Sequence, residues 1–280
     1  TLITHWPPVF PMMPAIFMTV LGTRAVTAAA WLNALSFSAT VWLSNRILSK
    51  FVRSPKLVIA FNVVLITVLS QVHLMVWSEP LFLALALFVV TLILKEPEQP
   101  SPRTLLIASA AMGVLILTRY AGIAFLGSCL LYFVIFTRQH SAWKNIALLS
   151  VICVAIVATW VVIVKMQPPN EASIRPIGFH PPGLLNAREF VTTVSKWMAP
   201  GIQARYGILI FTATLAFAAL LFPIKKALTS RRFLFLLFLS LGYLGFIVLS
   251  ITLFDALTPL DYRILSPAFP LILLLFTVLA

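Results

Sequence analysis

Two aspartates and an arginine lie close together between two long apolar segments near the end of the chain. The stretch FDALTPLDYRILSPAFP, residues 254–270, contains Asp255, Asp261 and Arg263. A charged side chain at the centre of a bilayer costs roughly 2.5 to 3.5 kcal/mol on insertion scales, so we expect these residues at a membrane face. Arg263 is expected in the first turn of the next helix, where the helix dipole disfavours a cation unless an anion is close. We therefore favour an anionic ligand at this position.

Both Asp261 and Arg263 also have a purely structural interpretation. Asp261 is suited to cap the last helix, because its carboxylate accepts hydrogen bonds from free backbone N–H groups. Arg263 could pair with Asp255 or Asp261 at the surface, a contact usually worth no more than about 1 kcal/mol. These structural interpretations remain alternatives to an anionic ligand.

Three further polar sites lie between apolar segments on the same predicted side. Arg119 and Tyr120 separate two closely spaced segments and could also reach lipid phosphates as belt residues. Glu79 precedes a proline at a segment start, where an acid suits the helix dipole without any catalytic purpose. His73 lies six residues earlier, so the two could share a metal or a proton, although no recognised ligand spacing is present.

Composition assigns the chain to the polytopic membrane proteins. Of its 280 residues, 61% are apolar and 10% charged, and the mean hydropathy is +1.05. The formal charge of +13 does not indicate nucleic-acid binding, because the basic residues stand between hydrophobic runs. Cys129 and Cys153 lie inside apolar runs, which favours core positions over a disulfide or a metal site. The sequence contains neither a glycine-rich phosphate loop nor a Ser/His/Asp signature, so it does not support chemistry on soluble nucleotides.

The apolar runs predict an all-α bundle of about nine membrane spans in a single transmembrane domain, residues 1–280. The predicted spans are residues 25–44, 57–72, 81–94, 104–118, 121–136, 145–165, 206–222, 233–254 and 264–280. Residues 1–14 contain four prolines and are expected to form a non-helical loop that re-enters the membrane surface. The chain starts without methionine and ends inside an apolar run, so we expect a fragment of a longer protein.

The basic residues predict the orientation. Twelve Lys and Arg residues fall in the predicted inner loops and three in the short outer segments, which puts residues 1–14 and most of the acids outside. The long loop 166–205 is then external. Asn186 can cap a helix, with Glu189 three residues later, and this pattern predicts an interfacial amphipathic helix at residues 187–198. Its expected apolar face is Phe190, Val191, Val194, Trp197 and Met198, and its polar face Arg188, Thr192, Ser195 and Lys196.

Four segments resemble, in this order, bacterial membrane glycosyltransferases of the GT-C superfamily: HWPPVFPMMPAI, WSEPLFLALAL, LTRYAGIAFL and TPLDYRILSPAFP. The group they resemble most is glycosyltransferase family 39, of the protein mannosyltransferase and aminoarabinose-transferase type. The resemblance implies a GT-C fold and the inverting transfer of a hexosyl or pentosyl group. The donor would be a polyprenyl-phosphate sugar and the acceptor a lipid, glycan or protein, at the outer or periplasmic face of the inner membrane.

The resemblance also implies roles for single residues. Arg263 in DYRILSP matches the arginine that meets the lipid phosphate, and Arg119 in LTRYAG a second cation on the phosphate side. Glu79 in SEP matches an acidic position of the second outer loop. The neighbours Tyr120, Tyr262 and His73 are expected to contact the substrate. In this family the catalytic acid usually lies in the first outer loop, which we expect to precede Thr1 here. The resemblance leaves open whether a divalent metal takes part.

Phosphate chemistry agrees with these roles. A leaving phosphate gathers negative charge. Guanidinium groups at helix ends in a partly dehydrated site stabilise this charge better than water does. The general base would be a partly desolvated carboxylate, for which Asp255, Asp261 and Glu79 are the candidates.

Two other classes of protein remain open. A transporter or flippase would bind the same lipid-linked anion, but polar groups near the midplane and interrupted helices are expected there. A structural subunit would tolerate exchange of Arg263 to Lys or Gln.

Overall fold

The computed structural model describes residues 7–137, 139–166, 178–198, 227–254 and 258–279 with the single positions 206, 209 and 213, and the regular secondary structure of these residues is all helical. This confirms the all-α prediction. The first six helices are α1 (Val9–Leu21), α2 (Ala25–Leu48), α3 (Pro55–His73), α4 (Glu79–Ile93), α5 (Pro102–Thr118) and α6 (Gly122–Phe136). They are followed by α7 (Gln139–Lys165), α8 (Leu184–Met198), α11 (Arg231–Leu253), α12 (Tyr262–Leu265) and α13 (Phe269–Leu279). The predicted span at 206–222 lies almost wholly outside the described residues.

Local sequence signals explain where several helices begin. Ser101 and Ser230 cap α5 and α11 by accepting hydrogen bonds from Thr104 N at 3.2 Å and Phe233 N at 3.4 Å. Pro55 stands in the first turn of α3, where its missing N–H costs nothing. The helix starts could therefore be predicted to within a few residues.

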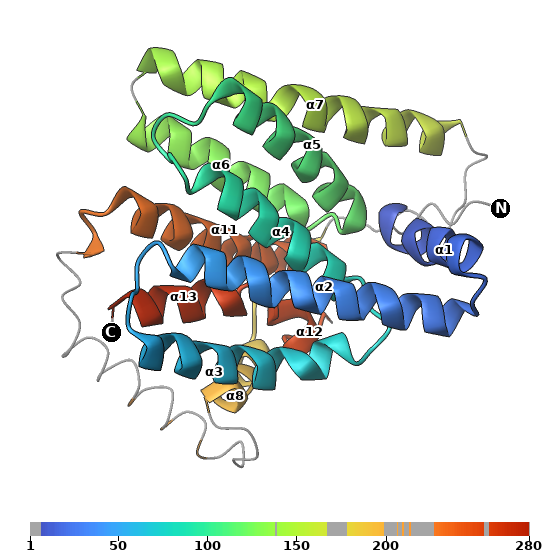
Figure 1. Ribbon diagram of the computed structural model, residues 1–280, viewed down its shortest axis with the longest axis horizontal. Coiled ribbons are helices and arrows are strands. Elements are labelled where there is room, and N and C mark those ends of the chain that lie inside the picture. The colour runs from blue at the N-terminus through green and yellow to red at the C-terminus, as the bar shows by residue number, and fades with distance from the viewer. Residues whose placement is uncertain are drawn as a thin grey trace.

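Four helices are long and apolar enough to cross a membrane by length and composition: Ala25–Leu48, Pro55–His73, Ser141–Lys165 and Arg231–Leu253. Their presence is compatible with a membrane protein. The other apolar helices, including α4, α5 and α6, have between 11 and 17 residues, whereas a helix needs about 20 to span the hydrocarbon core. In Figure 1, α2 and α7 extend further to the right than α4 and α5, whose ends on that side are set back within the bundle.

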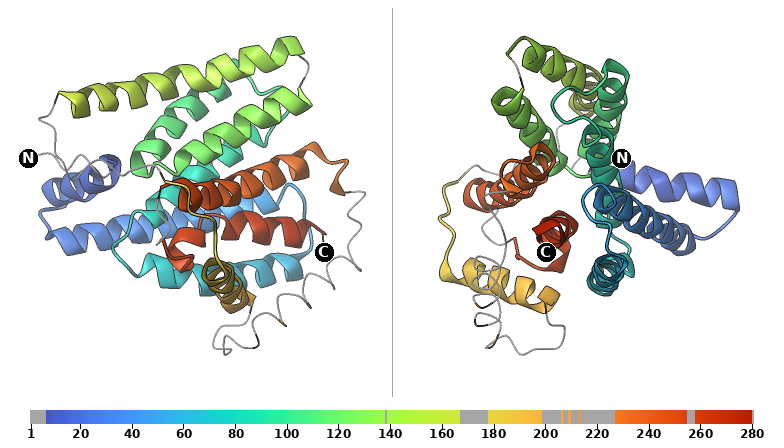
Figure 2. Two further views of the ribbon diagram at one scale, coloured as in Figure 1. Left: turned by 180° about the vertical axis from the view of Figure 1, so that it is seen from behind. Right: turned by 60° about the vertical axis from the view of Figure 1, so that its left-hand side comes forward.

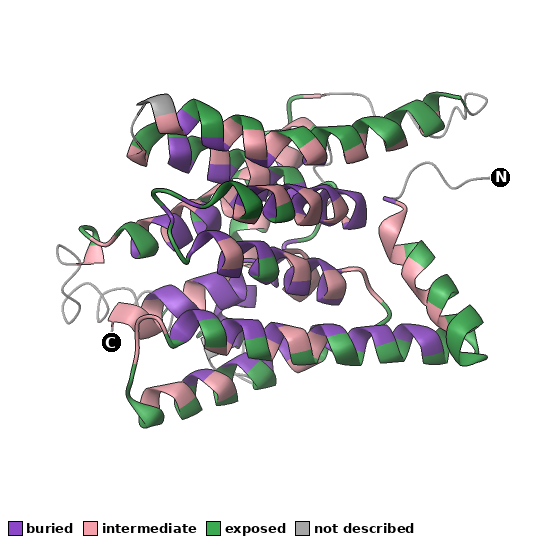
Figure 3. Cartoon of the chain, turned by 45° about the horizontal axis from the view of Figure 1, so that its top comes forward, coloured by how far each residue is buried: buried purple, intermediate pink, exposed green. Residues whose placement is uncertain are grey.

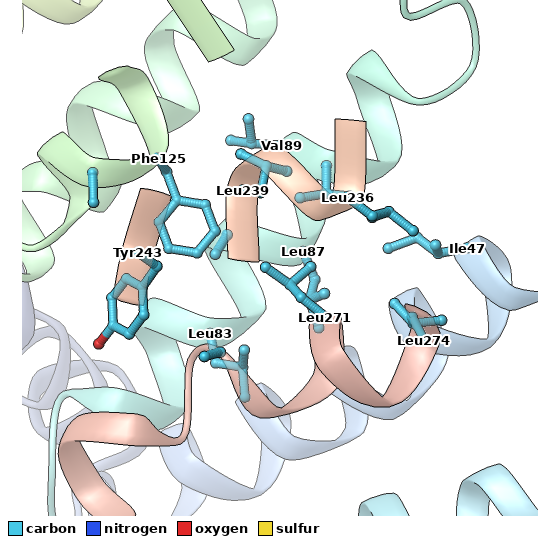
Figure 4. Close-up of a cluster of buried hydrophobic side chains, with 14 of the residues drawn as sticks. Ile47, Leu83, Leu87, Val89, Phe125, Leu236, Leu239, Tyr243, Leu271 and Leu274 are labelled. Atoms are coloured by element: carbon cyan, nitrogen blue, oxygen red, sulfur yellow. The ribbon is translucent and has the colours of Figure 1, made fainter. Parts of the chain in front are cut away.

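The helices pack around one apolar core. α2 packs on α4, α4 on α5, α5 on α7 and α6 on α11, while α13 packs on α11. Figure 4 shows part of this core, in which the Tyr243 ring lies beside Phe125 with ring centroids 5.6 Å apart. Cys129 and Cys153 are free and buried, which confirms the core positions predicted for them. By contrast, α7 exposes apolar residues along its outer face, including Val154 and Val162, as the green segments in Figure 3 illustrate.

A reciprocal amide pair joins α2 to α3. Asn45 Nδ2 donates to Asn62 Oδ1 at 2.7 Å, and Asn62 Nδ2 donates to Asn45 Oδ1 at 2.8 Å. Such side-chain pairs hold helices together where apolar surroundings offer no competing water. The sequence analysis did not find this pair, because it depends on which helices are neighbours.

Three predicted boundaries were wrong. A helix begins at Val9 although residues 1–14 were expected to be non-helical: Pro11 falls in the first turn, where no N–H is needed, and α1 tolerates Pro14 inside it. Residues 1–6 are not among the residues that the structure describes. Helix α7 starts at Gln139, within the expected inner loop, so Lys144 is helical. The last predicted span is broken, since α12 ends at Leu265 and α13 starts at Phe269.

The predicted external helix exists as α8, but it packs on the protein. It begins at Leu184, where Asn186 Oδ1 accepts a hydrogen bond from Gly183 N at 3.0 Å, so Asn186 reaches back to the helix start and is not its first cap. Ser195, expected on the polar face, is buried. Figure 2 shows α8 beside α12 and α13, and Trp197 contacts Phe269 with ring centroids 4.9 Å apart.

Candidate functional site

Three helices that are distant in sequence bring Glu79, Arg119 and Arg263 together. Glu79 is the first residue of α4, Arg119 follows the last residue of α5, and Arg263 lies in α12. An Arg119 Nη1 atom forms an ion pair with Glu79 Oε1, and Arg263 Nε lies 3.6 Å from the same oxygen. We call these three residues the Glu79 cluster. It lies at the set-back ends of α4 and α5.

Short local features fix the first two members. Pro80 follows Glu79 in the first turn of α4, so the acid stands at the positive end of the helix dipole. The turn after Arg119 is tight: a Cβ on Gly122 would lie 2.9 Å from backbone atoms of Ile116. Only glycine allows α6 to begin this close to α5. The position of Arg119 therefore depends on Gly122.

Exposure differs across the cluster. The Glu79 side chain is 4% exposed, Arg119 is 19% exposed and Arg263 is 37% exposed. A buried carboxylate is stable only when cations or hydrogen-bond donors compensate it. Glu79 is therefore the inner anchor of the cluster, and Arg263 is its outer edge.

Two aromatic residues support Arg263. Its guanidinium carbon lies 5.7 Å from the centre of the Trp77 ring, within range of a cation–π contact. The buried Tyr243 hydroxyl donates to the backbone oxygen of Ile264 at 2.9 Å, which ties α12 to α11. The arginine is thus held at a defined place although its helix has only four residues.

Charge in the cluster is unbalanced. Two guanidinium groups share one carboxylate oxygen, so among the described residues of the cluster one positive charge is in excess. Arg263 Nε is buried and has no hydrogen-bond partner among the described residues, because 3.6 Å is too long for a hydrogen bond to Glu79. The Arg263 side chain as a whole is 37% exposed, so the accessible part of its guanidinium can donate to an anion.

The predicted acids have separate outcomes. Asp261 Oδ1 accepts from Ile264 N at 3.0 Å and is the N-cap of α12, which confirms its structural interpretation. The surface pair between Arg263 and Asp261 was wrong, because the carboxylate beside Arg263 is that of Glu79. Asp255 lies outside the described residues. Glu79 contacts both arginines through Oε1, and its role as a general base stays a prediction.

The two tyrosines predicted to contact the substrate are sequence neighbours of the cluster, and among the described residues neither forms a hydrogen bond or ion pair with it. Tyr120 follows Arg119 and is 42% exposed. Tyr262 precedes Arg263 and packs against the core, and burial raises the pKa of its hydroxyl. Both stay predictions as substrate contacts.

His73 is buried at the end of α3. Its Nδ1 lies 2.8 Å from Leu69 O, and its ring lies 4.6 Å from the Phe37 ring, centroid to centroid. The described residues contain no group of three His, Cys, Asp or Glu that could hold a metal ion. The backbone next to His73 is fastened to α2, because Asn33 Nδ2 donates to the carbonyl oxygens of His73 and Met75.

Sequence analysis missed how α8 holds the segment before α12. Glu189 Oε2 accepts from Leu260 N at 3.1 Å, and Thr193 Oγ1 donates to Leu260 O at 2.7 Å. One helical turn separates the two side chains, so together they bind both backbone groups of one residue. We call this contact the Leu260 clamp. Its only sequence signal is the four-residue spacing of two polar side chains on a helix.

A second ionic group lies at the other end of α4 and α11. Arg231 Nε donates to Glu98 Oε1 at 3.0 Å, and the Arg231 guanidinium carbon lies 5.0 Å from the centre of the Phe136 ring. Tyr132 Oη donates to the backbone oxygen of Arg231 at 3.1 Å. Both charged side chains are about half exposed, at 46% and 53%.

Comparison of the chain with protein-family models, with curated proteins and with solved structures finds no match. The GT-C resemblance therefore stays a prediction from the four sequence segments.

Proposed function

We propose that the chain is a membrane glycosyltransferase that takes a sugar from a polyprenyl-phosphate donor. Transfer would occur with inversion at the outer face, to a lipid, glycan or protein acceptor. The observation that carries the proposal is the unbalanced Glu79 cluster, in which two arginines share one buried carboxylate. Its spare donor capacity matches a phosphate group.

Roles within the proposed site follow from burial. Arg263 is half exposed and would bind the donor phosphate directly, with Trp77 supporting the guanidinium from one side. Arg119 would add positive charge from deeper in the bundle, and Glu79 would hold both arginines in place. As the sugar departs, the phosphate gains negative charge, which preorganised guanidinium groups stabilise.

Donor turnover by the purified protein in liposomes tests this proposal. A panel of short-chain polyprenyl-phosphate sugars is supplied, and the released polyprenyl phosphate is measured by mass spectrometry. Arg263→Ala is expected to reduce turnover about 100-fold or more, the scale seen when one charge-stabilising donor is removed. Arg263→Lys keeps the charge but not the planar fork and should retain a small part of the activity.

Arg188→Ala is the matched control. Arg188 is an exposed cation on α8 that is not a member of the cluster, and its loss should leave turnover unchanged. Full turnover by Arg263→Ala, or an equal loss in both variants, would remove Arg263 from the reaction. Absence of turnover with every donor would contradict the transferase proposal itself.

A second function is favoured by one observation. The last segment is interrupted between α12 and α13, directly after Arg263, and interrupted helices beside a charged site are typical of transporters. In this alternative the same cluster moves a lipid-linked anion across the bilayer without breaking a bond. Liposomes containing a fluorescent polyprenyl-phosphate lipid separate the two: translocation without release of polyprenyl phosphate supports the transporter, and release supports the transferase.

A further inference from the structure

The end of the bundle opposite the Glu79 cluster has a surface hollow formed by two loops. It is lined by residues 95–99, which follow α4, and residues 230–232, where α11 begins, and its volume is about 680 Å³. Because it lies beyond the end of α4 and at the start of α11, it stands where the apolar helices give way to polar loops. We call it the basic hollow.

Cations in and around the basic hollow exceed the carboxylates available to pair with them. Lys95, Arg231 and Arg232 line it together with Glu96 and Glu98. Arg231 is paired with Glu98. Within the described part of the chain, neither Lys95 nor Arg232 has a carboxylate within ion-pair distance.

A neighbouring loop adds to this positive charge. Lys50, which follows α2, is partly buried, and burial together with the nearby cations Arg232, Lys95 and Arg46 lowers the pKa of its amine. Mutual repulsion of this kind means that an anion bound among these side chains would be favoured. The loops after α2 and α4 and the start of α11 thus share one electropositive surface.

Two tryptophans place this surface at the level of lipid headgroups. Trp42 on α2 is 57% exposed, and the Arg46 guanidinium carbon lies 5.3 Å from its ring centre. Trp143, near the start of α7, is 66% exposed. Exposed tryptophans gather at membrane interfaces, where their rings meet the headgroup region.

We propose that the basic hollow binds the phosphate of an anionic phospholipid headgroup, with Lys95 and Arg232 as its principal donors. Basic pockets between transmembrane helices are suited to such headgroups. The lipid's acyl chains would lie along the apolar helices below, which a free phosphate ion would not use. This site is independent of the Glu79 cluster and of the proposed transfer reaction.

Native mass spectrometry of the detergent-purified protein tests the site. Phosphatidylglycerol, phosphatidylcholine or inorganic phosphate is titrated, and the apparent Kd of the first bound molecule is measured. Phosphatidylglycerol is expected to bind at least tenfold more tightly than phosphatidylcholine. Each of Lys95→Gln and Arg232→Gln should weaken phosphatidylglycerol binding about fivefold, the contribution of one cation near a membrane surface.

Three further variants complete the test. Arg103→Gln removes an exposed cation at the same end but outside the hollow, and it should leave the Kd unchanged. Arg232→Lys should retain most of the binding, which separates charge from folding. Glu98→Gln releases Arg231 and should tighten binding.

Equal affinity for the two lipids would overturn the proposal. So would an Arg103→Gln effect as large as that of Arg232→Gln. Displacement of phosphatidylglycerol by millimolar inorganic phosphate would also overturn it, because the hollow would then be a site for a soluble anion.

Discussion

Two arginine–glutamate groups in the described part of the chain use the same types of side chain in opposite surroundings. At one end, Glu79 is 4% exposed and meets Arg119 and Arg263. At the other, Glu98 is 53% exposed and meets Arg231 alone. Each group is supported by a buried tyrosine whose hydroxyl donates to a backbone oxygen at or beside the arginine: Tyr243 to Ile264 and Tyr132 to Arg231.

This contrast separates stability from function. An exposed pair contributes at most about 1 kcal/mol, and its removal disturbs little. A buried pair loses in desolvation much of what it gains in attraction, so an apolar replacement of similar volume would often serve stability equally well. The Glu79 cluster is therefore poorly explained as a stabilising device. The phosphate of the proposed donor would neutralise the excess positive charge of its described residues.

The largest expected difference between the two groups concerns removal of the acid. Glu79→Gln leaves two guanidinium groups facing each other without a buried counter-charge and should lower the free energy of unfolding by about 3 to 5 kcal/mol. Glu98→Gln should lower it by no more than about 1 kcal/mol. Equilibrium unfolding in mixed detergent micelles measures both. Equal losses would show that Glu79 is not compensated as its burial indicates.

A second change should undo part of the first. Glu79→Gln combined with Arg119→Gln removes one uncompensated cation, so the double variant should be more stable than the Glu79→Gln single variant. The coupling between the two sites should lie between about 0.5 and 3 kcal/mol, the range for residues in direct contact. Additive losses in the same unfolding measurement would mean that the ion pair does not form in the membrane-embedded protein.

The two tyrosines give a smaller but sharper comparison. Tyr243→Phe and Tyr132→Phe each remove one buried hydrogen bond and should each cost about 0.5 to 1.5 kcal/mol of stability. Only Tyr243→Phe loosens α12 and Arg263, so only this variant should lower donor turnover in the liposome assay. Similar turnover by both variants would separate the Tyr243 hydrogen bond from the proposed site.

The smallest expected difference between the two arginine–glutamate groups is in how their coupling energies respond to salt. Raising the ionic strength from 0.01 to 1 M shortens the Debye length from about 30 Å to about 3 Å, which screens exposed charges far more than buried ones. The coupling energy of Arg231 and Glu98, measured by a double-mutant cycle, should approach zero in high salt. That of Arg119 and Glu79 should persist. Loss of both couplings would indicate that water reaches the Glu79 cluster freely.

Much of the helical architecture could be predicted, because the length and spacing of apolar runs reflect the hydrocarbon that must cover them. Helix α1 could not, since proline statistics do not reveal that Pro11 falls in a first turn. The break after Leu265 had a signal in Pro267, which has no N–H to donate into the helix, although Ser266 before it keeps a helical conformation. The apolar run on either side concealed that signal.

The residues of the Glu79 cluster were predicted from the sequence, but the contacts between them were not. Arg263, Arg119 and Glu79 were each singled out and assigned to one membrane face. Their pairing depends on how α4, α5 and α12 pack, which no local pattern encodes. For Asp261 the structural interpretation was the correct one, because its carboxylate caps α12. Glu189 was assigned to a cap of its own helix, whereas it binds Leu260.

The Leu260 clamp has a consequence for biogenesis. Glu189 and Thr193 precede Leu260 by 71 and 67 residues, so a ribosome finishes α8 well before it makes the segment that α8 will hold. The helix that binds this backbone is thus synthesised first, and the segment around Leu260 meets it afterwards. Seating of Arg263 by this contact can therefore take place only after α8 has been made.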